Sequence, residues 1–274
     1  MPVVSLPRFQ RVWDQVTGKK VQASLVDPNG GFLRFEEYNA GRHIVYTWYP
    51  MNESQMEGLK IGGLVLCGGR SRRMGLDKAS LPFGSETMLS RVVRKLSQVV
   101  SPIAVVAAQD QTLPELPDSV LVARDLEANR GPLQGLFSGM RCLQGSVDAL
   151  FATSCDVPLL SPAFVQRLIK LLGAHDVVVP VDTKYHHPLA AMYHIRIIGQ
   201  VQELLDSNRL RPIHLYDQVH TRRIDVEEMR SVDPNLNTLA NLNRPEDYLA
   251  ALQTAGFSVP RDVYSTLQNT IDDD

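Results

Sequence analysis

The chain has 274 residues, of which 44% are hydrophobic and 21% are charged, so it is long enough to bury a sizeable core. Its 28 basic and 30 acidic residues leave a net charge of −2, which excludes a global basic field that would hold nucleic acid or a membrane surface. The N-terminus lacks a signal-peptide pattern, and no apolar run approaches the roughly 18 residues that span a bilayer. We therefore expect a soluble, cytoplasmic protein without nucleic-acid or membrane partners.

The cysteine pattern points to a reducing compartment. Cys67, Cys142 and Cys155 are odd in number, scattered and never in a CxxC spacing. This pattern predicts neither a disulfide framework nor a zinc site.

Residues 1–58 predict a small β-rich N-terminal appendage. The segments "VDPNGGFLRFEEY" and "NAGRHIVYTWYP" indicate two or three short strands joined by Asn-Gly and Ala-Gly turns. Aromatic residues cluster here, including both tryptophans, and we expect them to serve packing. The polar stretch "MNESQMEGLK" is the expected linker, and the sequence leaves the role of the appendage open.

Strand and helix signals alternate from residue 61 onward. The continuous apolar run "IGGLVLC" predicts a strand buried on both faces, and further strands are expected at "PIAVVAA", "SVLVA", "DALFATSC" and "HDVVVPV". Helices are expected with Ser85 as a cap before apolar positions from Met88 to Val100, after "RGPLQGL", and with Ser161 capping and Pro162 opening "SPAFVQRLIKLL". The alternation predicts an α/β fold with a doubly wound, mostly parallel sheet over residues 59–258, followed by a tail, 259–274.

The loop after the first predicted strand carries a dense group of cations. Gly68 and Gly69 let the backbone approach a ligand closely, and four basic residues surround them: Arg70, Arg72, Arg73 and Lys78. The spacing matches neither GxGxxG nor GxxxxGK[ST], so the loop is not a standard dinucleotide or P-loop motif. The alternative is a strand-ending turn with solvated cations, but this density of charge favours a polyphosphate.

Two carboxylates are expected at the carboxyl ends of strands. Asp156 follows the run "ALFATSC", where it could hold Mg²⁺ or, equally well on these grounds, cap a helix or pair with an arginine. Asp125 follows "SVLVA", and taken alone it predicts a solvated loop charge.

The segment "LCGGRSRRMGLDKASLPFG" resembles the signature of the molybdenum cofactor guanylyltransferase family, among the nucleotidyltransferases of Rossmann-like fold. That family has Leu-Ala-Gly-Gly, then Arg-Met-Gly, then Asp-Lys; the corresponding residues here are Leu66-Cys67-Gly68-Gly69, Arg73-Met74-Gly75 and Asp77-Lys78. Further matches follow in order: "GPLQGL" after Asp125, "CDVPLL" around Asp156, "HPLAAMY" and "NLNRPEDY". The resemblance covers roughly residues 61–255.

The resemblance implies a site for GTP and a transfer reaction. The backbone of Leu66, Cys67, Gly68 and Gly69 would hold the guanine and phosphate end of GTP, and Asp125 would touch the nucleotide. Lys78, Arg73 and Asp156 would act in catalysis, with Asp156 as the ligand of Mg²⁺. The terminal phosphate of molybdopterin, or of its molybdenum-loaded form, would attack the α-phosphate of GTP, and pyrophosphate would leave. Positioning and charge neutralisation suffice for such chemistry, so no protein nucleophile is expected.

Two departures from the family pattern concern contacts with substrate. The chain has Gln109 after Ala108 where the family often has Asn, and His187 before Pro188 where glutamine is common. The pair His186-His187 is read as a loop feature or a contact to the pterin. Asn241 and Asn243 keep the Asn-x-Asn spacing of the family and are candidates on the pterin side. Gly68-Gly69 stands where related cytidylyltransferases tend to have Ala-Gly, which favours guanine over cytosine.

Two other functions are compatible with the sequence. The first is another nucleotidyltransferase of the same fold, acting with CTP on the pterin or acting on a sugar phosphate. The second is a non-catalytic nucleotide-binding regulator that uses the aromatic appendage to bind a partner. For the preferred function, the expected partners are GTP, molybdopterin, and the molybdoenzymes that accept the product or their chaperones.

Overall fold

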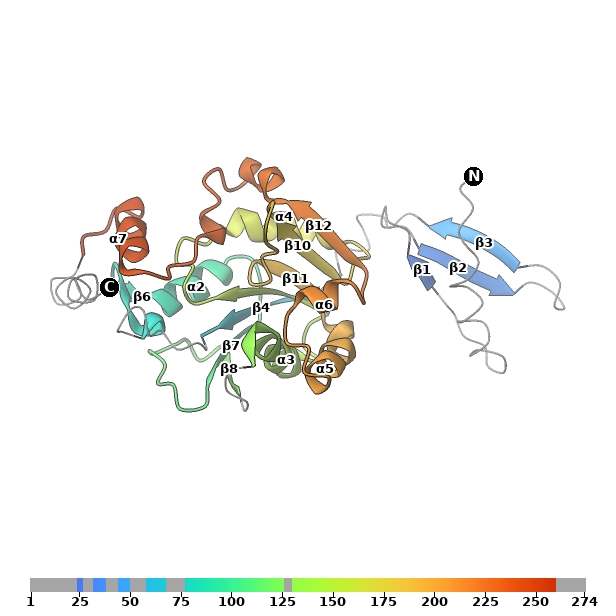
Figure 1. The fold of residues 1–274 in the computed structure, drawn as a ribbon, viewed down its shortest axis with the longest axis horizontal. Helices are drawn as coiled ribbons and strands as arrows, with labels where there is room; N and C mark the ends of the chain where they lie inside the picture. The colour runs from blue at the N-terminus through green and yellow to red at the C-terminus, as the bar shows by residue number, and fades with distance from the viewer. Residues whose placement is uncertain are drawn as a thin grey trace. The chain divides into compact units, whose positions relative to one another are not determined.

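A computed structural model of the protein describes residues 58–67, 77–125 and 130–259, together with the backbone of three strands nearer the N-terminus (Figure 1). The chain divides into two compact units, Met1–Asn52 and Glu53–Asp274. In the first unit, β1 (Ser24–Val26), β2 (Phe32–Glu37) and β3 (Ile44–Tyr49) pair as an antiparallel sheet in that order. The two expected turns lie outside the described residues, and the boundaries 1–58, 59–258 and 259–274 stay predictions.

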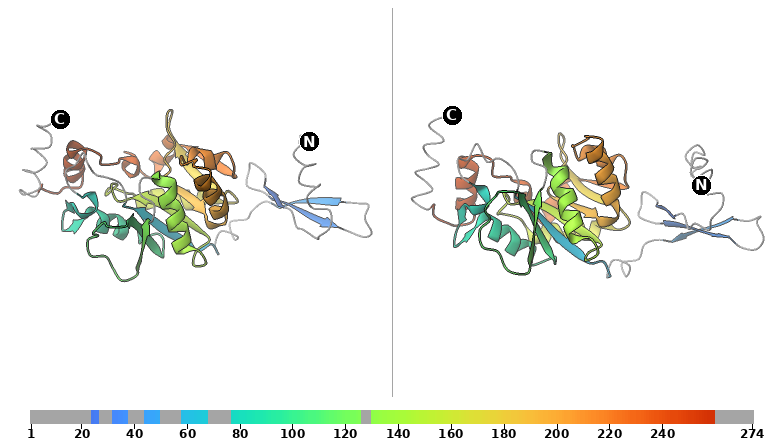
Figure 2. Two further views of the ribbon diagram at one scale, coloured as in Figure 1. Left: turned by 60° about the horizontal axis from the view of Figure 1, so that its bottom comes forward. Right: turned by 90° about the horizontal axis from the view of Figure 1, so that it is seen from below.

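The second unit is built on a seven-stranded sheet in the order β12-β10-β11-β9-β4-β7-β8 (Figures 1 and 2). Its strands are β4 (Ile61–Leu66), β7 (Ile103–Ala108), β8 (Val120–Asp125), β9 (Ala149–Ser154), β10 (Val177–Val181), β11 (Ala191–His194) and β12 (Thr221–Asp225). Only β11 runs antiparallel to its neighbours; the other adjacent pairs are parallel. The predicted doubly wound, mostly parallel sheet is confirmed.

Helices cover both faces of this sheet, as Figure 2 shows. The described α-helices are α2 (Met88–Leu96), α3 (Gly131–Leu143), α4 (Pro162–Leu172), α5 (Ile198–Asp206), α6 (Ile213–Tyr216) and α7 (Pro245–Thr254). Helices α2 and α4 bury one apolar cluster against the sheet, and α3, α5 and α6 bury another on the opposite face. Among the described helices, none is long and apolar enough to cross a membrane.

The helix start expected at Ser161 is confirmed, and the one expected at Ser85 is wrong. Ser161 accepts a hydrogen bond from the backbone amide of Phe164, and Pro162 opens α4. Helix α2 is capped by Thr87, whose hydroxyl accepts from the amide of Ser90 at 3.2 Å. Ser85 lies instead in the turn of a small hairpin, β5 (Pro82–Phe83) and β6 (Glu86–Thr87), which is too short to leave a periodic signal.

Helix α2 also ends earlier than its apolar periodicity predicts. The apolar positions continue to Val99 and Val100, but the helix ends at Leu96. Ser97 is the C-cap residue, and its amide donates to the carbonyl of Val93 at 2.8 Å. The last apolar residues instead form a turn, in which the amides of Val99 and Val100 both donate to the carbonyl of Leu96.

The C-terminal helix α7 packs on the β5–β6 hairpin rather than on the main sheet. Seven buried residues form this third cluster: Leu81, Phe83, Met88, Leu242, Tyr248, Ala251 and Leu252. The ring of Tyr248 meets Phe83 edge to face, with centroids 6.3 Å apart, and its hydroxyl donates to the carbonyl of Pro82. This packing fixes the chain segment that immediately precedes α7.

Close packing of α3 on the sheet makes Gly139 a specific test of the core. A Cβ added at Gly139 would lie 2.3 Å from Cδ1 of the fully buried Leu64 on β4. We expect Gly139→Ala to lower the free energy of unfolding by about 1–3 kcal/mol, because overpacking a rigid core forces neighbouring atoms apart. Gly199→Ala on α5, where nothing lies within 4 Å, is the control and should be neutral or slightly stabilising. Urea unfolding of both variants measures the difference; equal effects would contradict it.

Three histidines, one buried and two partly buried, are expected to make this unit less stable as the pH falls. Burial lowers the pKa of His175, His186 and His194 from the usual value of 6.5, so the fold favours their neutral form. As the pH falls, the histidines of the unfolded chain therefore bind protons at a higher pH than those of the folded chain. Their contribution to the free energy of unfolding is fully present above about pH 6.5 and is lost as the pH drops towards the folded-state pKa values.

Urea unfolding at about pH 7.5 and about pH 5.5 tests this expectation. His175 stacks on His220 with ring centroids 4.4 Å apart, and Arg222 and Asp176 lie close enough to affect its charge. We expect His175→Gln to show a smaller loss of stability between the two pH values than the wild type. An unchanged loss would show that His175 does not contribute.

Candidate active site

Lys78 and Asp156 meet at the carboxyl ends of the central strands. Lys78 opens the 3-10 helix η2 (Lys78–Ser80), and Asp156 stands two residues beyond β9. The Nζ atom of Lys78 lies 3.1 Å from Oδ2 of Asp156 and donates to Oδ1 of Asn243 at 3.0 Å. The side chains of Lys78 and Asp156 are only 14% and 15% exposed. A cation, a carboxylate and an amide from three distant parts of the chain thus form one polar cluster.

Asp156 is held by groups that orient its carboxylate. The hydroxyl of Ser154, the last residue of β9, donates to Oδ1, and the backbone amide of Leu242 donates to the Asp156 carbonyl at 2.9 Å. The sequence left two alternatives to a metal ligand, a helix cap and a pair with an arginine. Neither is found among the described contacts of Asp156, whose carboxylate pairs with Lys78 instead. The sequence analysis did not predict a role for Ser154, although a serine at the end of a mainly apolar strand is a usable signal.

Lys78 is positioned from its own short helix. Asp77 caps η2 by accepting from the amide of Ala79 at 3.4 Å and from the hydroxyl of Ser80 at 3.3 Å. The amide side chain of Gln111 also donates to Asp77 at 3.1 Å. The acidic residue of the Asp-Lys pair therefore fixes the backbone from which Lys78 reaches Asp156.

Asn243 owes its place to the start of α7. The carboxylate of Asp247 accepts from the amides of Asn243 and Arg244 at 3.0 and 2.9 Å. These two hydrogen bonds, together with the packing of α7, hold the Asn243 side chain towards Lys78. The sequence suggested a contact to the pterin for Asn243 and Asn241, whereas the structure places Asn243 against the catalytic candidate itself. The suggested role of Asn241 stays a prediction.

Asp125 lies away from this cluster. It ends β8, at the edge of the sheet, and accepts a hydrogen bond from Ser138 on α3 at 3.0 Å. Strands β8 and β9 are separated by β4 and β7, and three strand spacings amount to roughly 14 Å. One extended ligand could span the two carboxylates, so a nucleotide contact for Asp125 stays a prediction.

Part of the predicted phosphate loop falls outside the described residues. Gly68, Gly69 and Arg73, together with Arg70 and Arg72, belong to that part. Leu66 is the buried last residue of β4, and Cys67 follows it. A hydrogen bond with Cys155 and burial raise the pKa of the Cys67 thiol well above its ordinary value, which keeps it protonated at neutral pH.

The two histidines of the "HHPL" segment stabilise the loop between β10 and β11. His187 lies 3.1 Å from Oδ2 of Asp182, and its amide donates to the carbonyl of Pro180 at 2.9 Å. His186 packs on the ring of Tyr216, with centroids 5.3 Å apart, and accepts from Arg223 at 3.3 Å. Both histidines therefore take part in the structure of the loop, which is one of the two roles expected from the sequence. The other role, a contact to the pterin, stays a prediction.

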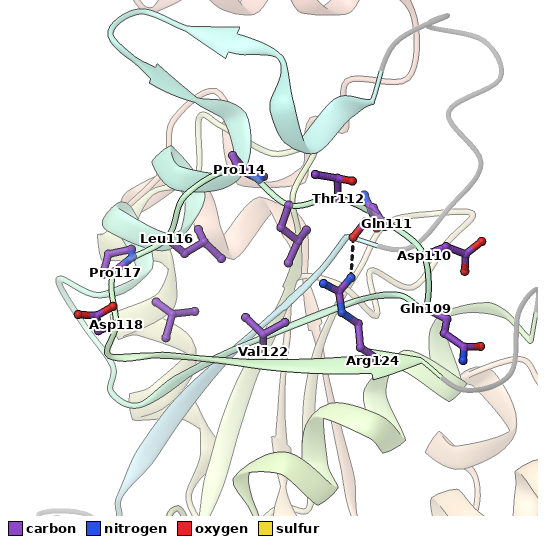
Figure 3. A pocket seen from close by; sticks show the side chains of 12 residues that line it. Gln109, Asp110, Gln111, Thr112, Pro114, Leu116, Pro117, Asp118, Val122 and Arg124 are labelled. Carbon is purple, nitrogen blue, oxygen red and sulfur yellow. Dashed lines mark hydrogen bonds between the residues drawn. The ribbon is translucent and has the colours of Figure 1, made fainter.

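A hollow of about 790 Å³ lies beside β8, under the loop of residues 109–119 (Figure 3). The guanidinium of Arg124 donates to the carbonyls of Gln111 and Ala108 at 2.6 and 3.0 Å, which ties the loop to the strand. Among the described residues that line it, neither Lys78 nor Asp156 is present, but Gln109 is. Through Gln111 and its bond to Asp77, the hollow adjoins the segment that carries Lys78.

Comparison with known proteins identifies the family of the chain. A family described as "MobA-like NTP transferase domain" matches residues 63–221. A protein of Mycobacterium avium named "Probable molybdenum cofactor guanylyltransferase" is 35% identical over 191 residues, which cover 68% of this chain and 95% of that protein. The chain belongs to the MobA-like NTP transferase family. Members of this family are nucleotidyltransferases, so the Lys78–Asp156 cluster lies in the catalytic domain of an enzyme family.

Solved structures show how widely the fold of this MobA-like domain is shared. A protein from Archaeoglobus fulgidus, titled molybdopterin-guanine dinucleotide biosynthesis protein A, superposes with a TM-score of 0.60 at 18% identity, covering 71% of this chain and 98% of that one. A 4-diphosphocytidyl-2C-methyl-D-erythritol synthase from Anaerococcus prevotii superposes with a TM-score of 0.53 at 11% identity, covering 75% and 100%. Since the second is a cytidylyl enzyme by title, the fold alone does not identify the base.

Proposed function

We propose that the protein transfers GMP from GTP to molybdopterin, or to its molybdenum-loaded form, and releases pyrophosphate. The observation that carries this proposal is the convergence of Lys78, Asp156 and Asn243, in a family member whose relatives are named as probable guanylyltransferases of the molybdenum cofactor. In the reaction, an oxygen of the acceptor's phosphate attacks the α-phosphorus of GTP. The bond from the α-phosphorus to the bridging oxygen breaks, and pyrophosphate leaves with that oxygen.

The residues of the cluster fit the electrostatic demands of this step. Charge accumulates on the phosphate oxygens as the α-phosphate is attacked, and a fixed ammonium stabilises it most when it needs no rearrangement. Lys78 is such an ammonium, since Asp156 and Asn243 hold its Nζ at 3.1 and 3.0 Å. The acceptor phosphate is already an anion, so the protein needs no side chain to deprotonate it.

Asp156 is the residue that would hold a divalent cation, expected to be Mg²⁺. Within residues 58–67, 77–125 and 130–259, no three histidine, cysteine or acidic side chains converge as a metal cluster. A single carboxylate still fits Mg²⁺, because this ion is commonly bound by one or two carboxylates, waters and the phosphates of the substrate. When bound, the ion would neutralise negative charge on the triphosphate. Asp156, oriented by Ser154, would be the ligand that the described residues supply.

Pyrophosphate release by the full chain tests the proposal. The protein is incubated with Mg²⁺ and molybdopterin, and GTP is compared with CTP in parallel reactions. We expect release with GTP and formation of the guanine dinucleotide, identified by mass spectrometry. Release with CTP instead would favour a CTP-dependent transferase that acts on the pterin. Activity only with sugar phosphates as acceptors would favour a sugar-phosphate nucleotidyltransferase. Binding of GTP without any transfer would favour the non-catalytic regulator.

The remaining sequence-based expectations accompany this proposal. A cytoplasmic location and transfer of the product to molybdoenzymes or their chaperones fit a cofactor-synthesising enzyme. Arg73 and the backbone of Leu66, Cys67, Gly68 and Gly69 are proposed to complete the nucleotide site from the loop beside Lys78.

A further inference from the structure

Two cysteines lie side by side at the point where the proposed site begins. Strands β4 and β9 pair in parallel up to Leu66 and Ser154, and the amide of Cys155 donates to the Leu66 carbonyl at 3.0 Å. The next pair in this register is Cys67 and Cys155. Both side chains belong to the same buried cluster on one face of the sheet, and the nearness of the Cys155 thiol helps to raise the pKa of Cys67.

The geometry of this pair suits a covalent bond between the sulfurs. Neighbouring strands are about 4.8 Å apart, so residues in register have Cα atoms within the range of about 4.4–6.8 Å that disulfides need. In-register residues of parallel strands also point to the same face, which directs both Cβ atoms alike. Cys142, on α3, packs against the cluster on the opposite face of the sheet and cannot reach either thiol.

We propose that a peroxide oxidises Cys67 and Cys155 to a reversible disulfide that inactivates nucleotidyl transfer; the inactivation rests on the function proposed above. The sulfur of Cys155 attacks a peroxide oxygen while its proton passes to the departing oxygen, the O–O bond breaks, and a sulfenic acid and water form. The sulfur of the other cysteine then displaces the sulfenic oxygen as a second water. The two thiols lose two electrons and two protons, and the peroxide is reduced.

A disulfide at this position acts directly on the catalytic cluster. Asp156 follows Cys155 in the chain, and the predicted phosphate loop follows Cys67. The bond draws the two sulfurs to about 2.05 Å, closer than thiols that share a hydrogen bond, and so pulls the strand ends together. A displacement of a catalytic group by about 1 Å costs up to about 100-fold in rate. We expect oxidation to lower the transfer rate by about 10- to 100-fold.

The oxidant has to be a small molecule, because both cysteines are buried. Cys67 and Cys155 are only 6% and 5% exposed, so bulky reagents are excluded, whereas hydrogen peroxide is little larger than water. Thiol reductants should restore activity, because thiol–disulfide exchange reverses the bond once reagent reaches it.

The test treats the full-length protein with hydrogen peroxide and maps its peptides by mass spectrometry. We expect a Cys67–Cys155 cross-link, one remaining free thiol at Cys142, and loss of transfer activity that dithiothreitol reverses. Cys142→Ser should behave like the wild type. Cys155→Ala should have the same activity after peroxide treatment as before it. Two free thiols at Cys67 and Cys155 after treatment, or a cross-link that leaves the transfer rate unchanged, would overturn the proposal.

The cross-link and the activity are separate readouts. The peptide map needs neither a variant nor a substrate, so it remains informative if Cys155→Ala does not fold. If the untreated wild type shows no transfer from GTP, the proposed function fails, while a mapped Cys67–Cys155 bond would still establish the oxidation site.

Discussion

Lys78→Ala is expected to lower kcat for nucleotidyl transfer by about 10²- to 10³-fold, the usual loss when one preorganised group that stabilises transition-state charge is removed. The effect should fall mainly on kcat, because the ammonium is held in place by Asp156 and Asn243 before the charge develops. Initial rates of pyrophosphate release over a range of GTP concentrations measure kcat and KM separately.

Matched variants separate charge from position at this site. Lys170→Ala removes an exposed lysine on α4 and should leave kcat unchanged. Asn243→Ala keeps the Lys78 ammonium but removes one of the groups that hold it, so we expect a smaller loss of kcat, about tenfold. Thermal unfolding confirms that each variant is folded. A folded Lys78→Ala protein with wild-type kcat would exclude the proposed role.

The main sheet was predictable because its strands leave a strong local signal. The run "DALFATSC" is mainly apolar, and β9, which it forms, is buried at every position, as expected for a strand covered by helices on both faces. The carboxyl-edge rule then placed Asp156 correctly, since it depends only on the direction of the strands. No element after Val181 was assigned; the antiparallel β11, for example, has only four residues and little periodicity.

The partners of the site residues were harder to predict, because packing between distant segments decides them. Asn243 lies 165 residues from Lys78 in sequence. Its side chain reaches Lys78 because Asp247 fixes the local backbone and Tyr248 anchors α7 to the hairpin. Neither contact follows from the Asn-x-Asn spacing. The Lys78–Asp156 ion pair, in contrast, joins two residues that family resemblance had already assigned to one site.

Asp156→Asn is expected to lower kcat by about 10²- to 10³-fold and to raise the Mg²⁺ concentration needed for half-maximal rate. Asparagine has nearly the shape of aspartate and keeps an oxygen that can accept from Ser154, so the fold of this region should persist. It lacks the negative charge that attracts a divalent cation. Pyrophosphate release measured over a Mg²⁺ titration checks both effects, with Asp206→Asn, an exposed change on α5, as the control.

The double variant Lys78→Ala with Asp156→Asn tests whether the two residues act as a unit. Groups that contact each other are not additive, and the 3.1 Å separation of Nζ and Oδ2 makes this pair a clear case. Each single change leaves the other residue without its charged partner, so part of each loss is shared. We therefore expect the double variant to lose little more activity than either single variant. Losses that multiply would indicate that Lys78 and Asp156 act independently, and would contradict a single Lys78–Asp156 catalytic unit.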